Sequence, residues 1–92
     1  MGQFKLEIKE IAQKHLKLHY KSGDKGSNKK IENILQELSQ TPYTGIGNPE
    51  PLKYDLSGLW SRRINQKDRV IYEVDEDVVT VFVVSAMGHY GD

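Results

Sequence analysis

The second half of this chain contains four short runs of strand-forming residues, and no other sequence feature constrains the fold as strongly. The runs cover residues 52–56, 59–64, 69–74 and 78–86. Only two to four residues separate one run from the next, and all of these residues are polar or glycine. Connections this short join neighbouring antiparallel strands, because parallel strands need a long crossover. The pattern therefore predicts a meander of antiparallel hairpins.

The last of these runs is almost continuously apolar. Its large apolar residues are Val78, Val79, Val81, Phe82, Val83 and Val84. A strand with one solvated face alternates apolar and polar residues, whereas a strand covered on both faces does not. We therefore expect a central strand over residues 78–86 that is buried on both faces.

The first half of the chain begins with a strand pattern that changes into a helical one. Phe4, Leu6 and Ile8 alternate with charged residues, which is the period of a half-buried strand. From Glu10 the apolar spacing lengthens to helical intervals, until the glycine-containing segment 22–26 interrupts it. A short N-terminal strand followed by a first helix is the prediction.

A second amphipathic helix follows, with Ser27 or Asn28 as its candidate N-cap and Pro42 as its terminator. Its apolar stripe at i, i+3, i+4 and i+7 consists of Ile31, Ile34, Leu35 and Leu38. The expected class is α+β, in which a short N-terminal strand precedes two helices packed on one face of an antiparallel β-sheet. Because 92 residues close only one hydrophobic core, we expect a single domain over residues 1–92.

Composition excludes several kinds of protein. The chain has no cysteine, so it has no disulfide framework, thiolate metal site or cysteine nucleophile, and a reducing, cytoplasmic location fits best. No apolar run approaches the roughly 18 residues of a membrane-spanning helix, and the N-terminus lacks the apolar block of a signal peptide. We therefore expect neither export nor a membrane partner.

Charge is distributed unevenly along the chain although the net charge is zero. Residues 1–40 carry eight Lys against five acidic residues, which gives +3, and residues 41–92 carry five Lys or Arg against eight acidic residues, which gives −3. All three arginines, Arg62, Arg63 and Arg69, lie in the acidic half. Arginine suits bidentate phosphate contact, although a solvated strand edge would also carry such residues.

Two segments hold charged residues that are fixed by their surroundings. Glu50 lies between Pro49 and Pro51, whose stiff backbones would hold its carboxylate in place. Arg63 and Arg69 flank a turn between two predicted strands, so they should face one another across the hairpin. Two opposed cations disfavour folding unless an anion is supplied, which points to a phosphate ligand.

His89 and Tyr90 follow the last predicted strand. A histidine there can titrate near neutral pH, and a tyrosine can stack on an unpaired base. Together with a carboxylate base and two cations, such a histidine would provide what RNA cleavage by its own 2′-hydroxyl needs without a metal. The alternatives are that Glu50 is a solvated loop acid, that the arginines are solvated strand charges and that His89 belongs to a frayed tail.

Other motifs carry less chemistry. His15 and His19 have the i, i+4 spacing of a metal-binding pair, but no third ligand is evident, so a partly exposed helix face is favoured over a metal site. The segment 45–47 is too truncated for a phosphate loop, and no serine has the partners of a hydrolase triad. We expect no metal and no cofactor.

Four ordered motifs in the last half of the chain together resemble the YoeB/Txe toxins of the RelE superfamily. The motifs are Gly45-x-Gly47-x-Pro49-Glu50-Pro51-Leu52-Lys53, Leu56-Ser57-Gly58-x-Trp60-Ser61-Arg62-Arg63-Ile64, Arg69-Val70-Ile71-Tyr72 and Gly88-His89-Tyr90. The N-terminal third matches only in its helix–helix layout and in ending at Thr41-Pro42.

The resemblance implies a RelE-like microbial ribonuclease fold and the toxin of a type II toxin–antitoxin module. Such a toxin is an endoribonuclease that enters the A site of the 70S ribosome, cuts the mRNA codon there and so inhibits translation. The implied partners are the ribosome, mRNA and a YefM-like antitoxin, through which operator DNA is bound, and a homodimer is compatible with the resemblance. Residues Gly91 and Asp92 extend past the usual His-Tyr end, and neutral net charge would weaken binding to free RNA.

The resemblance also implies a role for each matched residue. Glu50 would be the general base, His89 the general acid, Arg63 and Arg69 the phosphate and transition-state ligands, Lys53 an assisting RNA-binding residue and Tyr90 a positioning residue. Arg62 would contact the RNA backbone or solvent. Trp60 would be a core or dimer residue. Two other functions remain: a non-catalytic regulator that only binds an antitoxin, and a ParE-like toxin that acts on gyrase, against which the Gly88-His89-Tyr90 ending argues.

Overall fold

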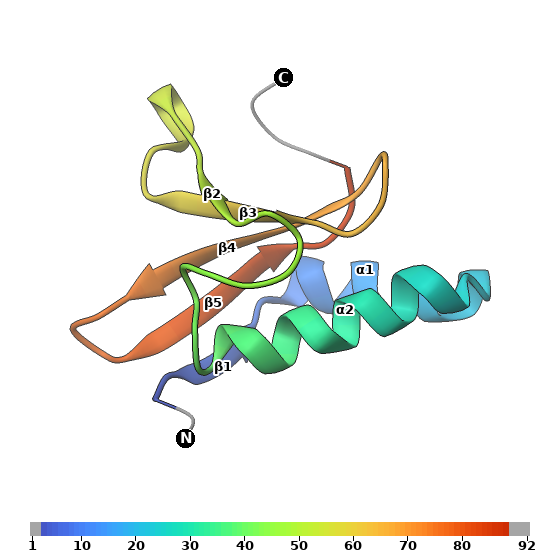
Figure 1. The fold of residues 1–92 in the computed structure, drawn as a ribbon, viewed down its shortest axis with the longest axis horizontal. Coiled ribbons are helices and arrows are strands. Elements are labelled where there is room, and N and C mark those ends of the chain that lie inside the picture. Colours follow the sequence, from blue (N-terminus) through green and yellow to red (C-terminus); the bar gives the residue numbers. More distant parts are fainter. Residues whose placement is uncertain (1–2, 89–92) are drawn as a thin grey trace.

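The computed structural model describes residues 3–88, so His89, Tyr90, Gly91 and Asp92 lie outside the described residues. The elements in chain order are β1 (Lys5–Ile8), α1 (Glu10–Ser22), α2 (Lys25–Leu38), β2 (Glu50–Pro51), the 3₁₀ turn η1 (Tyr54–Leu56), β3 (Leu59–Arg63), β4 (Arg69–Asp75) and β5 (Thr80–Ser85). Figure 1 shows both helices on one side of the sheet. The predicted α+β arrangement is confirmed. Neither helix within residues 3–88 has the length and apolarity needed to cross a membrane.

The five strands form one sheet in the order β1-β5-β4-β3-β2. Strands β2 to β5 pair antiparallel, as the short connections predict. Strand β1 pairs parallel to β5, so the complete sheet is mixed and not purely antiparallel. No local pattern could specify this pairing, because the partner of β1 lies at the other end of the chain and the two helices form the crossover.

Two predicted strands have different bounds in the structure. Residues 52–56 do not form a strand, because Tyr54 takes a positive φ of 59° and the chain turns through η1. The last strand begins at Thr80, because the Asp75 carboxylate accepts backbone hydrogen bonds from Asp77 and Val78 and closes a turn there. Val78 is therefore exposed, and the expectation of a strand starting at residue 78 is wrong.

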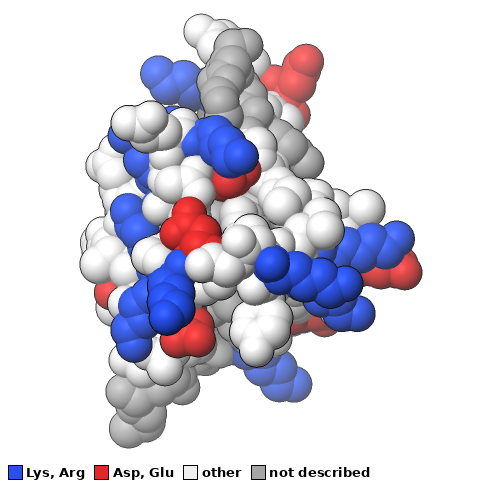
Figure 2. All heavy atoms as spheres, turned by 90° about the vertical axis from the view of Figure 1, so that its right-hand side faces the viewer, with Lys and Arg blue, Asp and Glu red and all other residues white. Residues whose placement is uncertain are grey.

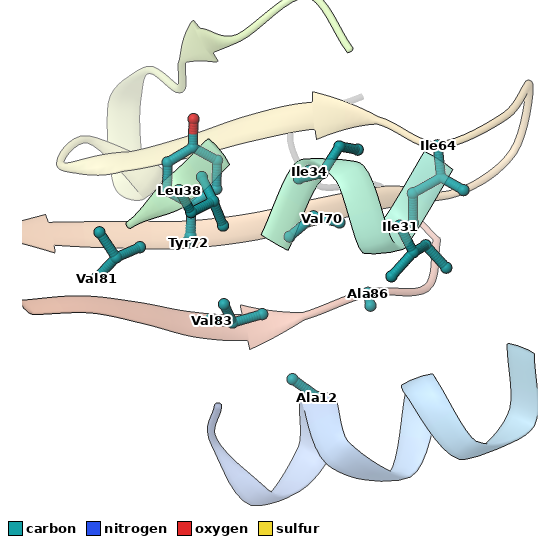
Figure 3. Close-up of a cluster of buried hydrophobic side chains, with 10 residues drawn as sticks. All are labelled: Ala12, Ile31, Ile34, Leu38, Ile64, Val70, Tyr72, Val81, Val83 and Ala86. Carbon is teal, nitrogen blue, oxygen red and sulfur yellow. The ribbon is translucent and has the colours of Figure 1, made fainter. Parts of the chain in front are cut away.

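The core lies between the helices and one face of the sheet (Figure 3). Its helical side chains are Ala12, Ile31, Ile34 and Leu38, and its strand side chains include Val70, Tyr72, Val81 and Val83. Full burial of a large apolar side chain contributes about 1.5–3 kcal/mol relative to exposure. The apolar stripe predicted for the second helix is thus confirmed as its packing face.

The N-cap of α2 is Asp24, three residues before the predicted Ser27. The Asp24 carboxylate accepts a hydrogen bond from the Ser27 backbone N–H at 3.1 Å. The same carboxylate accepts the Ser27 hydroxyl at 2.9 Å, and these bonds hold the pKa of Asp24 below its usual value. Ser27 is buried inside the first turn of α2 instead of capping the start of the helix.

The sheet has a second face that the helices do not cover. Alternation along β5 directs Val81 and Val83 toward the helices, where both are fully buried, while Phe82 and Val84 on the opposite side are only half-buried. The expectation that this strand is buried on both faces is therefore wrong. The open face is the one on which the candidate site lies.

Candidate active site on the open face of the sheet

Glu50 reaches the sheet as part of a two-residue edge strand. It lies opposite Ser61 in the β2–β3 ladder, and the neighbouring Pro51 lies opposite Trp60. The Leu52 N–H donates to the carbonyl of Leu59 at 2.8 Å, which continues this pairing toward η1. Glu50 is exposed, so its carboxylate is accessible from solvent. A rigid position for this residue, predicted from the flanking prolines, is supported by its place in the sheet.

Arg63 and Arg69 are direct partners in the β3–β4 ladder, as the sequence predicts. The Arg63 N–H donates to Gly47 at 2.6 Å and the Arg69 N–H to Gly88 at 2.9 Å, so neither donates to the other. They therefore form a non-hydrogen-bonded pair, the kind in which facing side chains lie closest. Within residues 3–88 neither guanidinium takes part in an ion pair.

Strand register places Glu50 on the same face as both arginines. Directly opposed residues in an antiparallel ladder point to the same side, so Glu50 shares a face with Ser61, and Arg63 shares a face with Arg69. Ser61 and Arg63 are two residues apart on β3 and also share that face. One carboxylate and two cations therefore lie together, separated along the strands by about 7 Å.

The end of the described chain is tied to the start of β4. Gly88 accepts a hydrogen bond from the Arg69 N–H, and its own N–H donates to the Asp68 carboxylate at 2.9 Å. Gly88 immediately precedes His89, so the backbone leading to this residue is anchored beside one of the two arginines. His89 and Tyr90 themselves lie outside the described residues.

Arg62 occupies the opposite face of β3 and is completely buried. Its guanidinium forms an ion pair with Glu37 at 2.7 Å and donates to loop carbonyls instead of facing solvent. Because a fully buried side chain reaches neither RNA nor solvent, the expectation that Arg62 contacts the RNA backbone or solvent is wrong. Alternation along a strand predicts that two adjacent arginines point to opposite faces, but it does not say which of the two points inward.

Lys53 and Trp60 lie near the site but differ in their exposure to solvent. Lys53 lies two residues after the end of β2 and is exposed, and its role in RNA binding stays a prediction. Trp60 points toward the helix-covered face, where its ring packs against the core and lies 5.1 Å from that of Tyr43. Trp60 is thus a half-buried residue at the edge of the core, which agrees with the first of its two predicted roles, and a role in a dimer stays a prediction.

The two histidines of α1 bind the backbone of Ala86, the residue that follows β5. The Ala86 N–H donates to His15 Nδ1 at 3.0 Å, and His19 Nε2 lies 2.7 Å from the Ala86 carbonyl. His19 is buried and His15 half-buried, so the expectation of a partly exposed helix face is wrong for His19. Within residues 3–88 no group of three potential metal ligands occurs.

Two tyrosines near the core have altered acidity. Tyr43 donates to the Glu76 carboxylate at 2.7 Å, and this hydrogen bond raises the pKa of its phenol to about 12. Burial raises the pKa of Tyr72, opposed by its contact with Arg62. Figure 2 shows basic and acidic side chains interspersed over the face in view, with no large region of one sign.

Comparison with known proteins places this architecture in one class. Residues 12–90 match the family model described as the YoeB-like toxin of bacterial type II toxin–antitoxin systems. The chain is 41% identical over 73 residues to the toxin YoeB of Escherichia coli O6:H1, covering 79% of this chain and 84% of that protein. The chain belongs to the YoeB-like toxins of bacterial type II toxin–antitoxin systems.

Two solved structures from Staphylococcus aureus share the fold. The YoeB dimer superimposes with a TM-score of 0.78 at 32% identity, covering 96% of this chain and 99% of that chain. The YoeB–YefM complex superimposes with a TM-score of 0.76 at 32% identity, covering 95% of this chain and 98% of that chain. The sequence-based resemblance to this family is therefore confirmed.

Proposed function

We propose that this toxin is a metal-independent endoribonuclease that cleaves mRNA in the A site of the ribosome and thereby inhibits translation. The observation that supports cleavage most directly is the shared open face of Glu50, Arg63 and Arg69. A base and two cations on one exposed surface suit a phosphodiester that approaches from solvent.

The proposed reaction uses the 2′-hydroxyl of the substrate as the nucleophile. The Glu50 carboxylate removes the 2′-hydroxyl proton, and the oxygen attacks the adjacent phosphorus. Arg63 and Arg69 stabilise the additional negative charge of the phosphorane, because both guanidinium groups are held there without an ion pair to any residue between 3 and 88. His89 gives a proton to the departing 5′-oxygen, which leaves a 2′,3′-cyclic phosphate and a free 5′-hydroxyl.

Two further residues complete the proposed site. Lys53 contacts the RNA backbone, because its side chain is exposed and lies only two residues after the end of β2, which carries Glu50. Tyr90 positions the base or the scissile phosphate by stacking. Arg62 is not assigned to RNA, because it is buried on the other side of the sheet.

The ribosome enters the proposal through the charge balance. Zero net charge provides little counterion-release affinity for free RNA, so a shaped pocket must hold the substrate. In the cell the toxin is then cytoplasmic and pairs with a YefM-like antitoxin, which links it to operator DNA. The S. aureus relatives, solved as a dimer and as a YoeB–YefM complex, support an antitoxin partner and a homodimer as parts of this proposal.

The proposal is tested by primer extension on mRNA incubated with the purified toxin, with and without 70S ribosomes. Cleavage within the A-site codon is expected only with ribosomes, and Glu50→Ala or His89→Ala should abolish most of it. Cleavage retained in the double variant would refute the assigned mechanism. Antitoxin binding without any cleavage would instead identify a non-catalytic regulator, and inhibition of gyrase supercoiling would identify a ParE-like toxin.

A further inference from the structure

We propose that Arg62 is a positioning residue, whose buried guanidinium fixes the loop that leads to Glu50 against the strand carrying Arg63. This inference rests on the proposed function and concerns how its general base is held. Arg62 and Arg63 are neighbours on β3 but point to opposite faces, so one strand segment carries both a substrate-facing cation and an internal clamp.

The guanidinium of Arg62 binds three parts of the molecule at once, namely helix α2, the loop 41–46 and strand β4. Its Nη2 donates to the carbonyls of Thr41 at 2.6 Å and Thr44 at 2.8 Å. Its Nη1 donates to Glu37 Oε1 at 2.7 Å and to the Ile46 carbonyl at 3.4 Å. Its Nε donates to the Tyr72 hydroxyl at 3.2 Å. Five contacts match the five N–H donors that a guanidinium carries, so none is left unused.

The partners of Arg62 bind the same loop and extend the clamp. Glu37 Oε1 also accepts the Ile46 N–H at 3.0 Å, and the Tyr72 hydroxyl donates to the Pro42 carbonyl at 2.7 Å. The segment 41–46 contains no helix or strand, so these side chains replace the backbone ladders that would otherwise order it. Arg62 is therefore the centre of the network that orders this segment.

The glycines of the loop allow it to approach the clamp closely. A Cβ atom at Gly45 would collide with Glu37 Oε1 and lie 2.9 Å from Arg62 Nη1. Gly47 follows, and its carbonyl accepts the Arg63 N–H, after which only Asn48 and Pro49 precede Glu50. A loop fixed at residues 41–47 therefore starts the approach to Glu50 from a defined point on β3.

Lysine cannot reproduce this arrangement, although it keeps the charge. Its single ammonium group offers three donors from one point, whereas the loop carbonyls and Glu37 are bound by a planar fork. Arg62→Lys should therefore fold while leaving loop carbonyls unpaired. A variant that loses the order of the loop but keeps a folded core distinguishes a positioning role of Arg62 from a role in overall stability.

The first test measures the steady-state kinetics of cleavage on programmed ribosomes. In Arg62→Lys we expect kcat to fall at least about tenfold while KM changes less than about threefold, because substrate contacts remain. When Arg62→Lys is added to Glu50→Ala, the rate should fall no further, since the effect acts through Glu50. Ile31→Val, which loosens the core away from the loop, serves as the control and should leave kcat unchanged below its melting temperature.

The second test does not depend on cleavage. Amide hydrogen exchange should become faster at residues 41–50 in Arg62→Lys, while protection in β4 and β5 stays as in the wild type. Unchanged loop exchange, or an equal rate loss in the wild-type and Glu50→Ala backgrounds, would overturn the inference. A wild-type protein that does not cleave mRNA would refute the proposed function, whereas hydrogen exchange would still decide whether Arg62 holds the loop.

Discussion

Arg63 and Arg69 face each other across the β3–β4 ladder as a non-hydrogen-bonded pair, and within residues 3–88 neither forms an ion pair. Like charges that are directly opposed destabilise a sheet. Their juxtaposition therefore lowers the stability of the free protein, and the same pair is the proposed site for the substrate phosphate.

Replacing one arginine of this pair should raise stability and lower activity together. Arg63→Gln removes the repulsion, and we expect the free energy of unfolding in urea to increase by about 0.2–1 kcal/mol. Cleavage on ribosomes should fall, because half of the cationic pair is lost. Lys29→Gln on the exposed side of α2 is the charge-matched control and should change neither quantity appreciably. A loss of stability in Arg63→Gln would show that the two arginines do not repel one another.

Removing the proposed general base should lower activity without affecting folding. Glu50→Gln keeps the shape of an exposed side chain, so the melting temperature should stay close to that of the wild type. The single-turnover cleavage rate should fall by about 10²–10⁴, which is the usual contribution of a positioned base. Glu32→Gln, an equally exposed acid on α2, is the matched control. An active Glu50→Gln enzyme would exclude this residue as the base.

Gly47 should be more sensitive to substitution than another glycine with a similar backbone conformation. Gly47 and Gly23 have φ values of 82° and 78°, so alanine strains both by about 1–2 kcal/mol. At Gly47 the added Cβ would also lie 3.0 Å from the Arg63 carbonyl, whereas at Gly23 it meets nothing within 4 Å. Gly47→Ala should therefore lower the free energy of unfolding in urea more than Gly23→Ala does. Of the two substitutions, only Gly47→Ala should impair cleavage. Equal effects of the two substitutions on both measurements would contradict this reading of the close approach.

The Tyr43–Glu76 hydrogen bond should give the protein a stability component that disappears at high pH. The bond raises the phenol pKa from 10.0 to about 12, so the folded state favours the neutral phenol. The contribution is complete below pH 10 and is lost as the pH rises to about 12. Ultraviolet titration of tyrosinate, compared between the wild type and Tyr43→Phe, measures this pKa. Glu76→Gln should return it toward 10, and Glu73→Gln, which changes another exposed acid, should not.

Sequence periodicity and turn length were sufficient for much of the fold and for part of the site. The spacing of Ile31, Ile34 and Leu38 predicted the buried face of α2, because helix geometry alone brings these positions together. The turn after Arg63 predicted its pairing with Arg69, because hairpin register is a local property. The family motifs then connected Glu50 with the same site.

Tertiary structure decided which polar residues point inward. Two adjacent arginines look alike in sequence, yet Arg62 is buried and Arg63 is exposed, because Glu37 on α2 and the carbonyls of a distant loop compensate the inner charge. Likewise His15 and His19 bind Ala86 far along the chain, and β1 joins the sheet in parallel. Local patterns reflect short-range geometry, whereas the partner of a buried charge or an edge strand exists only once the chain has folded.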